Sequence, residues 1–105
     1  MREALKLAKQ ALKYGEVPVG AVVVLEDKII GKGFNQSIRK NDPTAHAEIQ
    51  AIKEAAIFLN NYRLTGAKIY STLEPCLMCS GALVHSRIDE IIFSAHDPKS
   101  GVIES

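Results

Sequence analysis

The sequence predicts a single three-layer α/β/α domain with a mixed central sheet. Two observations support this prediction: two adjacent strand-like segments over 19–34, joined by a short turn, and a strand–helix–strand segment over 67–94. A hairpin is antiparallel, whereas strands joined by a helix pair in parallel, so the sheet should contain both arrangements. With 105 residues, of which 47% are hydrophobic and 24% charged, the chain fits one globular domain.

The first elements are a helix and the hairpin. Residues 3–14 place apolar side chains on one stripe and lysines on the opposite side, which is typical of an amphipathic helix, and Gly15 is expected to end it. Residues 19–25 are apolar on both faces, which indicates a central strand. Glu26 and Asp27 then form the expected turn into a strand over 28–34.

The second half of the chain predicts two helices and two strands. Asp42 and Pro43 are expected to start a helix that runs to about Leu59, because Asp caps free N–H groups and Pro fits the first helical position. A strand over 67–73, a helix over 76–86 and a strand over 88–94 follow. Ligands of such units bind beyond the carboxyl ends of the strands, which here directly precede two cysteines.

Charge and hydropathy exclude several classes of protein. Thirteen basic and twelve acidic residues give a net charge of +1, so binding to nucleic acid through a basic tail alone is excluded. No apolar run reaches the length of a membrane span, and lysines interrupt the apolar positions of the first dozen residues, unlike a secretory signal. Two cysteines three residues apart then indicate metal or redox chemistry, and the cytosol as the compartment.

Glu48 lies on the apolar face of the helix expected over 43–59. A buried carboxylate is costly, so Glu48 needs a partner or a chemical role. His46 would lie on another side of that helix, yet both side chains could reach a site near its first turn. The alternative is a first-turn glutamate stabilised by the helix dipole, beside a histidine that belongs to the core.

Cys76 and Cys79 share one face at the start of the next helix, an end that favours thiolates. They fit a zinc half-site, a thioredoxin-like redox pair, or two small buried apolar side chains. Together with His46 they would supply three zinc ligands and leave one position open, the pattern of catalytic zinc, which lowers the pKa of bound water to about 7. His85 would lie on a different side of its helix from Cys79, whereas the sequence does not exclude His96 as a fourth ligand.

The segments His46-Ala47-Glu48 and Pro75-Cys76-Leu77-Met78-Cys79 match the H-x-E and P-C-x-x-C signature of zinc deaminases. On these residues the chain resembles the cytidine-deaminase-like superfamily and, within it, the bacterial tRNA-specific adenosine deaminases. The narrower resemblance covers nearly the whole chain and rests on further segments, namely 15–21 (GEVPVGA), 41–49 (NDPTAHAEI), 72–76 (TLEPC), 81–82, 86–88 (SRI) and 97–101 (DPKSG).

The resemblance implies a cytidine-deaminase-like fold over residues 1–105, one zinc per chain, and hydrolytic conversion of adenosine to inosine at the wobble position of a tRNA anticodon. Glu48 would move protons during catalysis, and zinc would be held by His46, Cys76 and Cys79. Substrate contacts are expected from Val17, Asn35, Ala47, Asp97 and Lys99.

The resemblance also concerns assembly. Its members are homodimers that build part of the substrate site across the interface, so we expect a homodimer that binds a tRNA anticodon loop and no membrane. Members usually continue beyond the position of Gly101 with another strand and C-terminal helices, and we expect this chain to lack them.

Three other functions stay open. The same chemistry would serve a deaminase of a free base or nucleoside, such as guanine or cytosine. A thioredoxin-like dithiol protein would use the two cysteines but has no use for His46 and Glu48, and the chain lacks the Trp usual in that family. An inactive zinc-binding fragment or partner subunit is the third.

Overall fold

The central sheet is mixed, as predicted. A computed structural model describes residues 1–95, and these form one four-stranded sheet in the order β2-β1-β3-β4. β1 pairs antiparallel with both β2 and β3, whereas β3 and β4 are parallel. The predicted hairpin and the predicted parallel pair are therefore both confirmed. The strands are β1 (Gly20–Leu25), β2 (Lys28–Phe34), β3 (Lys68–Ser71) and β4 (Glu90–Phe93).

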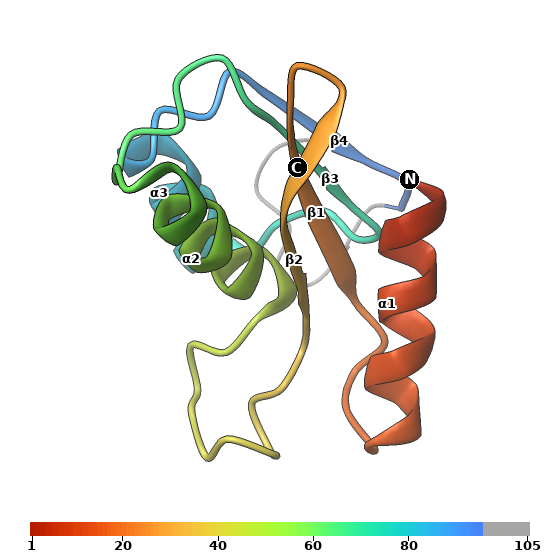
Figure 1. Ribbon diagram of the computed structural model, residues 1–105. Helices are drawn as coiled ribbons and strands as arrows, with labels where there is room; N and C mark the ends of the chain where they lie inside the picture. The colour runs from red at the N-terminus through yellow and green to blue at the C-terminus, as the bar shows by residue number, and fades with distance from the viewer. Residues whose placement is uncertain (96–105) are drawn as a thin grey trace.

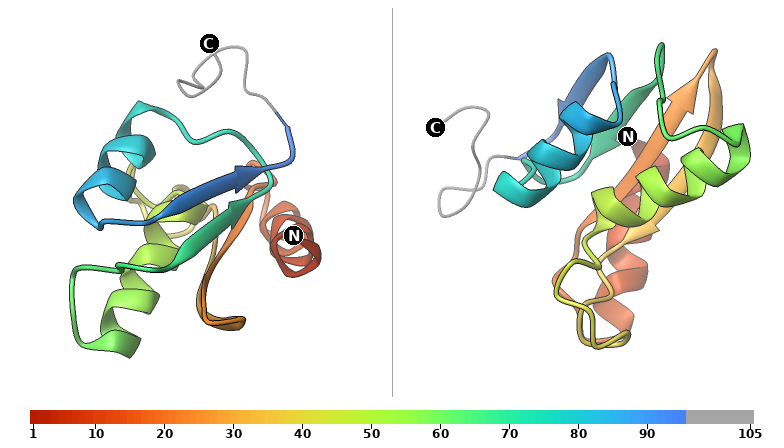
Figure 2. Two further views of the ribbon diagram at one scale, coloured as in Figure 1. Left: turned by 90° about the horizontal axis from the view of Figure 1, so that it is seen from above. Right: turned by 90° about the vertical axis from the view of Figure 1, so that its left-hand side faces the viewer.

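Helices cover both faces of the sheet, which confirms the three-layer α/β/α prediction. One face carries α1 (Arg2–Lys13), and the opposite face carries α2 (Ala47–Leu59) and α3 (Leu77–His85) (Figures 1 and 2). The predicted element bounds agree to within two residues, apart from the start of α2. Within residues 1–95, no helix combines the length and apolarity needed to cross a membrane.

Residues with left-handed backbone shape the turns that the sequence predicted. Gly15 has φ +72, and Glu16 N donates to Ala11 O at 3.1 Å, the closing hydrogen bond of a Schellman cap on α1. Glu26 and Asp27, with φ values of 51 and 64, form the two-residue turn between β1 and β2. Two left-handed central residues match the right-handed twist of a hairpin.

The expected helix start at Asp42 and Pro43 is wrong, because α2 begins at Ala47 with His46 as its N-cap. Asp42 instead closes a local turn: its Oδ1 accepts from Thr44 N at 2.8 Å and from Thr44 Oγ1 at 2.7 Å. An Asp side chain competes for nearby backbone N–H groups in this way and favours turns as well as helix caps. The later start gives His46 an extended backbone instead of a place on the helix.

Glycines in the sheet allow the helices to approach closely. A Cβ at Gly33 would lie 2.2 Å from Ala47 O, and a Cβ at Gly31 would lie 2.2 Å from Ala51 O. Both glycines are on β2 and both oxygens are in α2, so the helix backbone rests directly on the strand. This contact sets the height of α2 above the sheet, and the buried alanines of α2 join the main apolar core.

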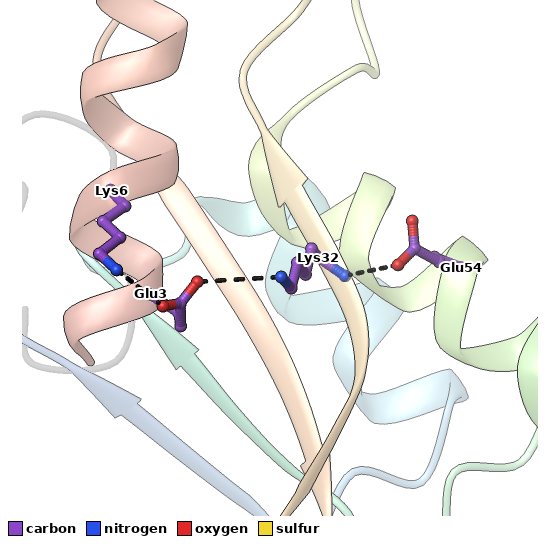
Figure 3. A network of polar contacts seen from close by, with 4 residues as sticks. All are labelled: Glu3, Lys6, Lys32 and Glu54. Carbon is purple, nitrogen blue, oxygen red and sulfur yellow. Dashed lines mark hydrogen bonds and ion pairs between the residues drawn. The ribbon is translucent and has the colours of Figure 1, made fainter.

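The edge strand β2 is covered by polar contacts from both helical layers (Figure 3). Lys32 N donates to Glu54 Oε1 of α2 at 3.2 Å, and the Lys32 ammonium lies 3.8 Å from Glu3 of α1. Glu3 also pairs with Lys6 at 3.2 Å. Exposed ion pairs contribute little to stability, but a charged edge opposes unwanted strand pairing.

We predict that Gly33→Ala destabilises the zinc-loaded protein by about 3 kcal/mol or more, because its methyl group would overlap a helix backbone that has no room to move. Urea denaturation measures the loss. Lys32→Ala is the matched control on the next residue of the strand, and it should change stability by less than about 0.5 kcal/mol. Equal losses for the two variants would contradict the packing argument.

Candidate metal centre

Three potential metal ligands converge where two helices begin. His46 is the N-cap of α2 and Cys76 is the N-cap of α3, while Cys79 lies in the first turn of α3. The His46 Nδ1 atom lies 3.6 Å from Cys76 Sγ and 3.5 Å from Cys79 Sγ. His46 lies 30 and 33 residues before the two cysteines in the sequence, and the fold brings the three side chains together, as predicted.

The donor set fits zinc in both chemistry and spacing. Zn–N bonds of about 2.0–2.1 Å and Zn–S bonds of about 2.3 Å at a tetrahedral angle separate N from S by about 3.6 Å. The two observed N···S separations are 3.6 and 3.5 Å, and the potential ligand atoms all lie within 4.8 Å of one another. Three ligands would leave the fourth tetrahedral position open.

The environment of Cys79 disfavours a free thiolate. Burial raises the pKa of its thiol well above the usual range, and the charges of Glu48 and Cys76 raise it further. The helix end was expected to favour thiolates, but burial outweighs that effect here. A reactive dithiol needs a readily formed thiolate, which this site disfavours unless a cation is present.

Glu48 is buried, as predicted, with 4% of its surface exposed. Burial raises the pKa of its carboxyl group above the usual value for glutamate. Its Oε2 lies 3.4 Å from Ser71 Oγ at the end of β3, whereas the same hydroxyl lies 2.8 Å from Leu73 O. The Ser71 hydroxyl donates to both acceptors, and the shorter bond goes to Leu73 O, so Glu48 receives only a long hydrogen bond from Ser71. A carboxyl group with a raised pKa is suited to exchanging protons near neutral pH.

A cavity of about 200 Å³ opens beside these groups. Typical pockets for drug-sized ligands measure about 300–1,000 Å³, so this one suits a group the size of a single ring system. It combines apolar walls with the polar atoms of the candidate centre. Its lining residues are Val17, Val19, Asn35, His46, Glu48, Leu73, Glu74 and Cys76.

The residues expected to contact substrate fall into three groups. Val17 and Asn35 line the cavity. Ala47 is fully buried and donates its N–H to Asn35 Oδ1 at 2.8 Å, so this N–H is already hydrogen-bonded at the start of α2. Asp97 and Lys99 lie outside the described residues, as does His96.

Sequence reasoning missed Val19, Leu73 and Glu74 as lining residues. Leu73 and Glu74 directly precede the P-C-x-x-C segment at the carboxyl end of β3, a position from which they could have been inferred. Val19 carries no such signal, because it comes to the cavity only through the packing of β1 against its neighbours.

A deaminase family matches this fold and centre. The family profile "Cytidine and deoxycytidylate deaminase zinc-binding region" covers residues 1–95. The chain belongs to this family, whose members bind zinc, in agreement with the donor set formed by His46, Cys76 and Cys79.

Within the family, the chain is similar to tRNA-specific adenosine deaminases. It is 57% identical to that of Buchnera aphidicola subsp. Baizongia pistaciae over 90% of this chain and 59% of the relative. It is 54% identical to that of Haemophilus influenzae over 100% of this chain and 61% of the relative. The chain thus spans roughly three-fifths of the length of these two curated relatives.

The chain is also similar to deaminases whose structures have been solved. A chain from structural studies of A-to-I editing by tRNA:A34 deaminases at the wobble position of transfer RNA matches with a TM-score of 0.98 and 46% identity, covering 100% of this chain and 76% of that one. Guanine deaminase from Bacillus subtilis matches with a TM-score of 0.87 and 38% identity, covering 90% and 61% of the two chains. Both matches confirm the predicted cytidine-deaminase-like fold.

We predict that Cys79→Ala abolishes stoichiometric zinc binding, because two remaining ligands cannot hold the ion tightly. Atomic absorption after gel filtration measures the metal, and thermal melting with and without a chelator measures its contribution to stability. Ser80→Ala is the matched control on the next residue: its hydroxyl is buried and has no hydrogen-bond partner among residues 1–95, so its removal should leave zinc content unchanged. Full zinc content in Cys79→Ala would contradict the proposed ligand set.

Proposed function

We propose that this chain is the catalytic part of a zinc-dependent adenosine deaminase that forms inosine at the wobble position of a tRNA anticodon. The observation that carries the proposal is the buried Glu48 carboxyl beside a His-Cys-Cys donor set, at a cavity sized for one base. Zinc held by these donors would supply a hydroxide nucleophile at neutral pH. Because tRNA is the proposed substrate, we propose the cytosol as the compartment of this activity.

The proposed reaction is hydrolytic. Water adds its oxygen at C6 of adenine, the C6–N bond breaks, and ammonia leaves, so that adenosine becomes inosine. Glu48 takes one proton from the water and delivers it to N1 of the ring. It then passes the second proton, from the added hydroxyl, to the amino group, which leaves as ammonia. Its buried position and raised pKa support this role, since a fully ionised, solvated carboxylate holds a proton poorly.

The target base would have to leave its stack to reach the cavity. We propose that Asn35 and Val17 contact it there, because both line the cavity. The Oδ1 atom of Asn35 is engaged by Ala47 N, which leaves the Asn35 amide group as a hydrogen-bond donor. The proposed contacts of Ala47, Asp97 and Lys99 rest on the family resemblance alone.

A guanine deaminase is the second candidate, because one is 38% identical to this chain over 90% of its length. The tRNA-specific relatives are closer in sequence, at 57% and 54% identity. Their similarity favours adenosine in tRNA as the substrate. The two functions differ in their substrate. The first converts adenosine within RNA to inosine, whereas the second removes the amino group of free guanine.

We predict that zinc-loaded wild-type protein forms inosine in an anticodon stem-loop with adenosine at the wobble position. Glu48→Gln should lower the rate by about 10²–10⁴-fold at unchanged zinc content, because the amide cannot accept the water proton. Glu54→Gln, at an exposed site on the same helix, is the control and should keep full activity. Inosine is measured by digestion and mass spectrometry.

Zinc content, inosine in RNA and ammonia from guanine together distinguish the proposed function from its alternatives. Loss of zinc in Glu48→Gln would make Glu48 a ligand instead of a proton carrier. Folded, zinc-loaded wild type without RNA activity but with ammonia release from guanine would favour the second candidate. Inactivity on both substrates would support the inactive zinc-binding fragment.

We further propose that the chain forms a homodimer through α3. Its outward face carries Leu77 and Val84, whose exposures of 75% and 70% are high for large apolar residues. These side chains lie seven residues apart and therefore share one side of the helix. An apolar helix face in water favours association with a second surface.

We predict that Val84→Glu converts the dimer to a monomer, because a charge would be buried at the interface. Sedimentation velocity over a range of concentrations gives the oligomeric state, and zinc content shows that the variant is folded. Leu12→Glu is the control, since Leu12 is similarly exposed but lies on α1 in the opposite layer. A dimer that survives Val84→Glu would contradict an α3 interface.

A further inference from the structure

The segment between Asn35 and His46 is a loop, and the two residues that flank it both line the cavity. Gln36 N donates to Ala45 O at 2.9 Å and closes the loop at its base. Turn bonds within it include Lys40 N to Gln36 O at 2.9 Å. These bonds shape the loop itself, but they do not attach its outer part to the rest of the protein.

Glu16 supplies that attachment. Its two carboxylate oxygens accept from Ile38 N at 3.2 Å and from Arg39 N at 2.8 Å. Only 4% of Glu16 is exposed, so the carboxylate is removed from water and relies on these two backbone donors. A hydrogen bond to a charged acceptor is stronger than one to a neutral acceptor, and a buried one is stronger still.

Glu16 directly precedes the opposite wall of the cavity in the sequence. Its backbone is held by the cap of α1, through the bond from Glu16 N to Ala11 O. The following residues Val17 and Val19 both line the cavity. The carboxylate of Glu16 therefore joins the segment that carries Val17 and Val19 to the loop that connects Asn35 and His46 on the other side.

Two weaker, exposed contacts support the same loop. Lys40 Nζ donates to Gln50 Oε1 of α2 at 3.0 Å. The guanidinium of Arg39 lies 4.2 Å from the centre of the Tyr14 ring, just before Glu16 in the sequence. Tyr14 in turn stacks on Phe34 at 6.2 Å with an interplanar angle of 11°. Exposed cation–π contacts contribute less than a buried charged hydrogen bond, so Glu16 is the stronger attachment.

We propose that Glu16 is a positioning residue for the substrate cavity: it holds the loop over 36–45 against residues 16–19 and so keeps the entrance in its binding shape. Glu16 does not line the cavity and touches no substrate. The inference rests on the proposed function for its substrate, and on the observed hydrogen bonds of Glu16 alone for its structural part. Pre-forming an entrance lowers the apparent Kd because less of the protein occupies shapes that cannot bind.

Limited trypsin digestion tests the attachment without any substrate. Arg39 and Lys40 are exposed trypsin sites within the loop. In zinc-loaded Glu16→Ala, cleavage after these two residues should be faster by about tenfold or more, the opening expected when charge-assisted hydrogen bonds are lost. Glu16→Gln keeps one acceptor oxygen and should show a smaller increase.

Glu54→Ala is the matched control, because the Glu54 carboxylate also accepts a backbone N–H, from Lys32, but outside the loop. It should leave cleavage after Arg39 and Lys40 at the wild-type rate. Unchanged cleavage of Glu16→Ala at these sites would overturn the proposal. Faster cleavage at every Lys and Arg, with lower zinc content, would overturn it as well, because Glu16 would then serve global stability.

Kinetics on the wobble stem-loop test the consequence for substrate. Glu16→Ala should raise KM by about fivefold or more and leave kcat within about twofold, because the loop shapes the entrance and not the reacting groups. A fall in kcat at unchanged KM would overturn the positioning role. If wild type is inactive on this RNA, the proposed function fails, and the trypsin comparison alone still decides whether Glu16 holds the loop.

Discussion

The close contact between α2 and β2 is the constraint on which the candidate centre depends. Gly31 and Gly33 let the helix backbone rest on the strand at a separation that no Cβ would allow. At that height the first turn of α2 places Glu48 beside Ser71 at the end of β3, and His46 against the cysteines of α3. Larger residues at the glycines would lift the helix and separate donors whose spacing matches zinc.

The centre concentrates groups that are unfavourable in a protein interior. A buried carboxyl, two thiols and an imidazole lie together, and the raised pKa values of Glu48 and Cys79 reflect the cost of charge there. A cation relieves this cost, because it stabilises thiolates and attracts the carboxylate. Metal binding and local stability are therefore coupled, and removal of the metal would change the stability of this region.

The cavity is assembled from segments that differ in how firmly they are held. His46, Glu48 and Cys76 come from the first residues of two helices, whereas Val17 and Asn35 come from connecting segments. Loops commonly supply substrate contacts on a rigid scaffold. In this chain the scaffold carries the proposed chemistry, and the connecting segments, joined through Glu16, form the entrance.

The sequence alone determined the mixed sheet, the three layers and the groups of the centre, because hydrophobic periodicity and the H-x-E and P-C-x-x-C segments are local signals. Tertiary structure decided where α2 begins and which side chains complete the cavity. Asp42 has the chemistry of a helix cap or of a turn. In the folded chain it closes a turn with Thr44, while Ala47 N at the start of α2 donates to Asn35 Oδ1. Glu16 likewise shows no local sign of its role, since its hydrogen-bond donors lie 22 and 23 residues away. Contacts between residues so far apart depend on the packing of the whole sheet, which no short segment encodes.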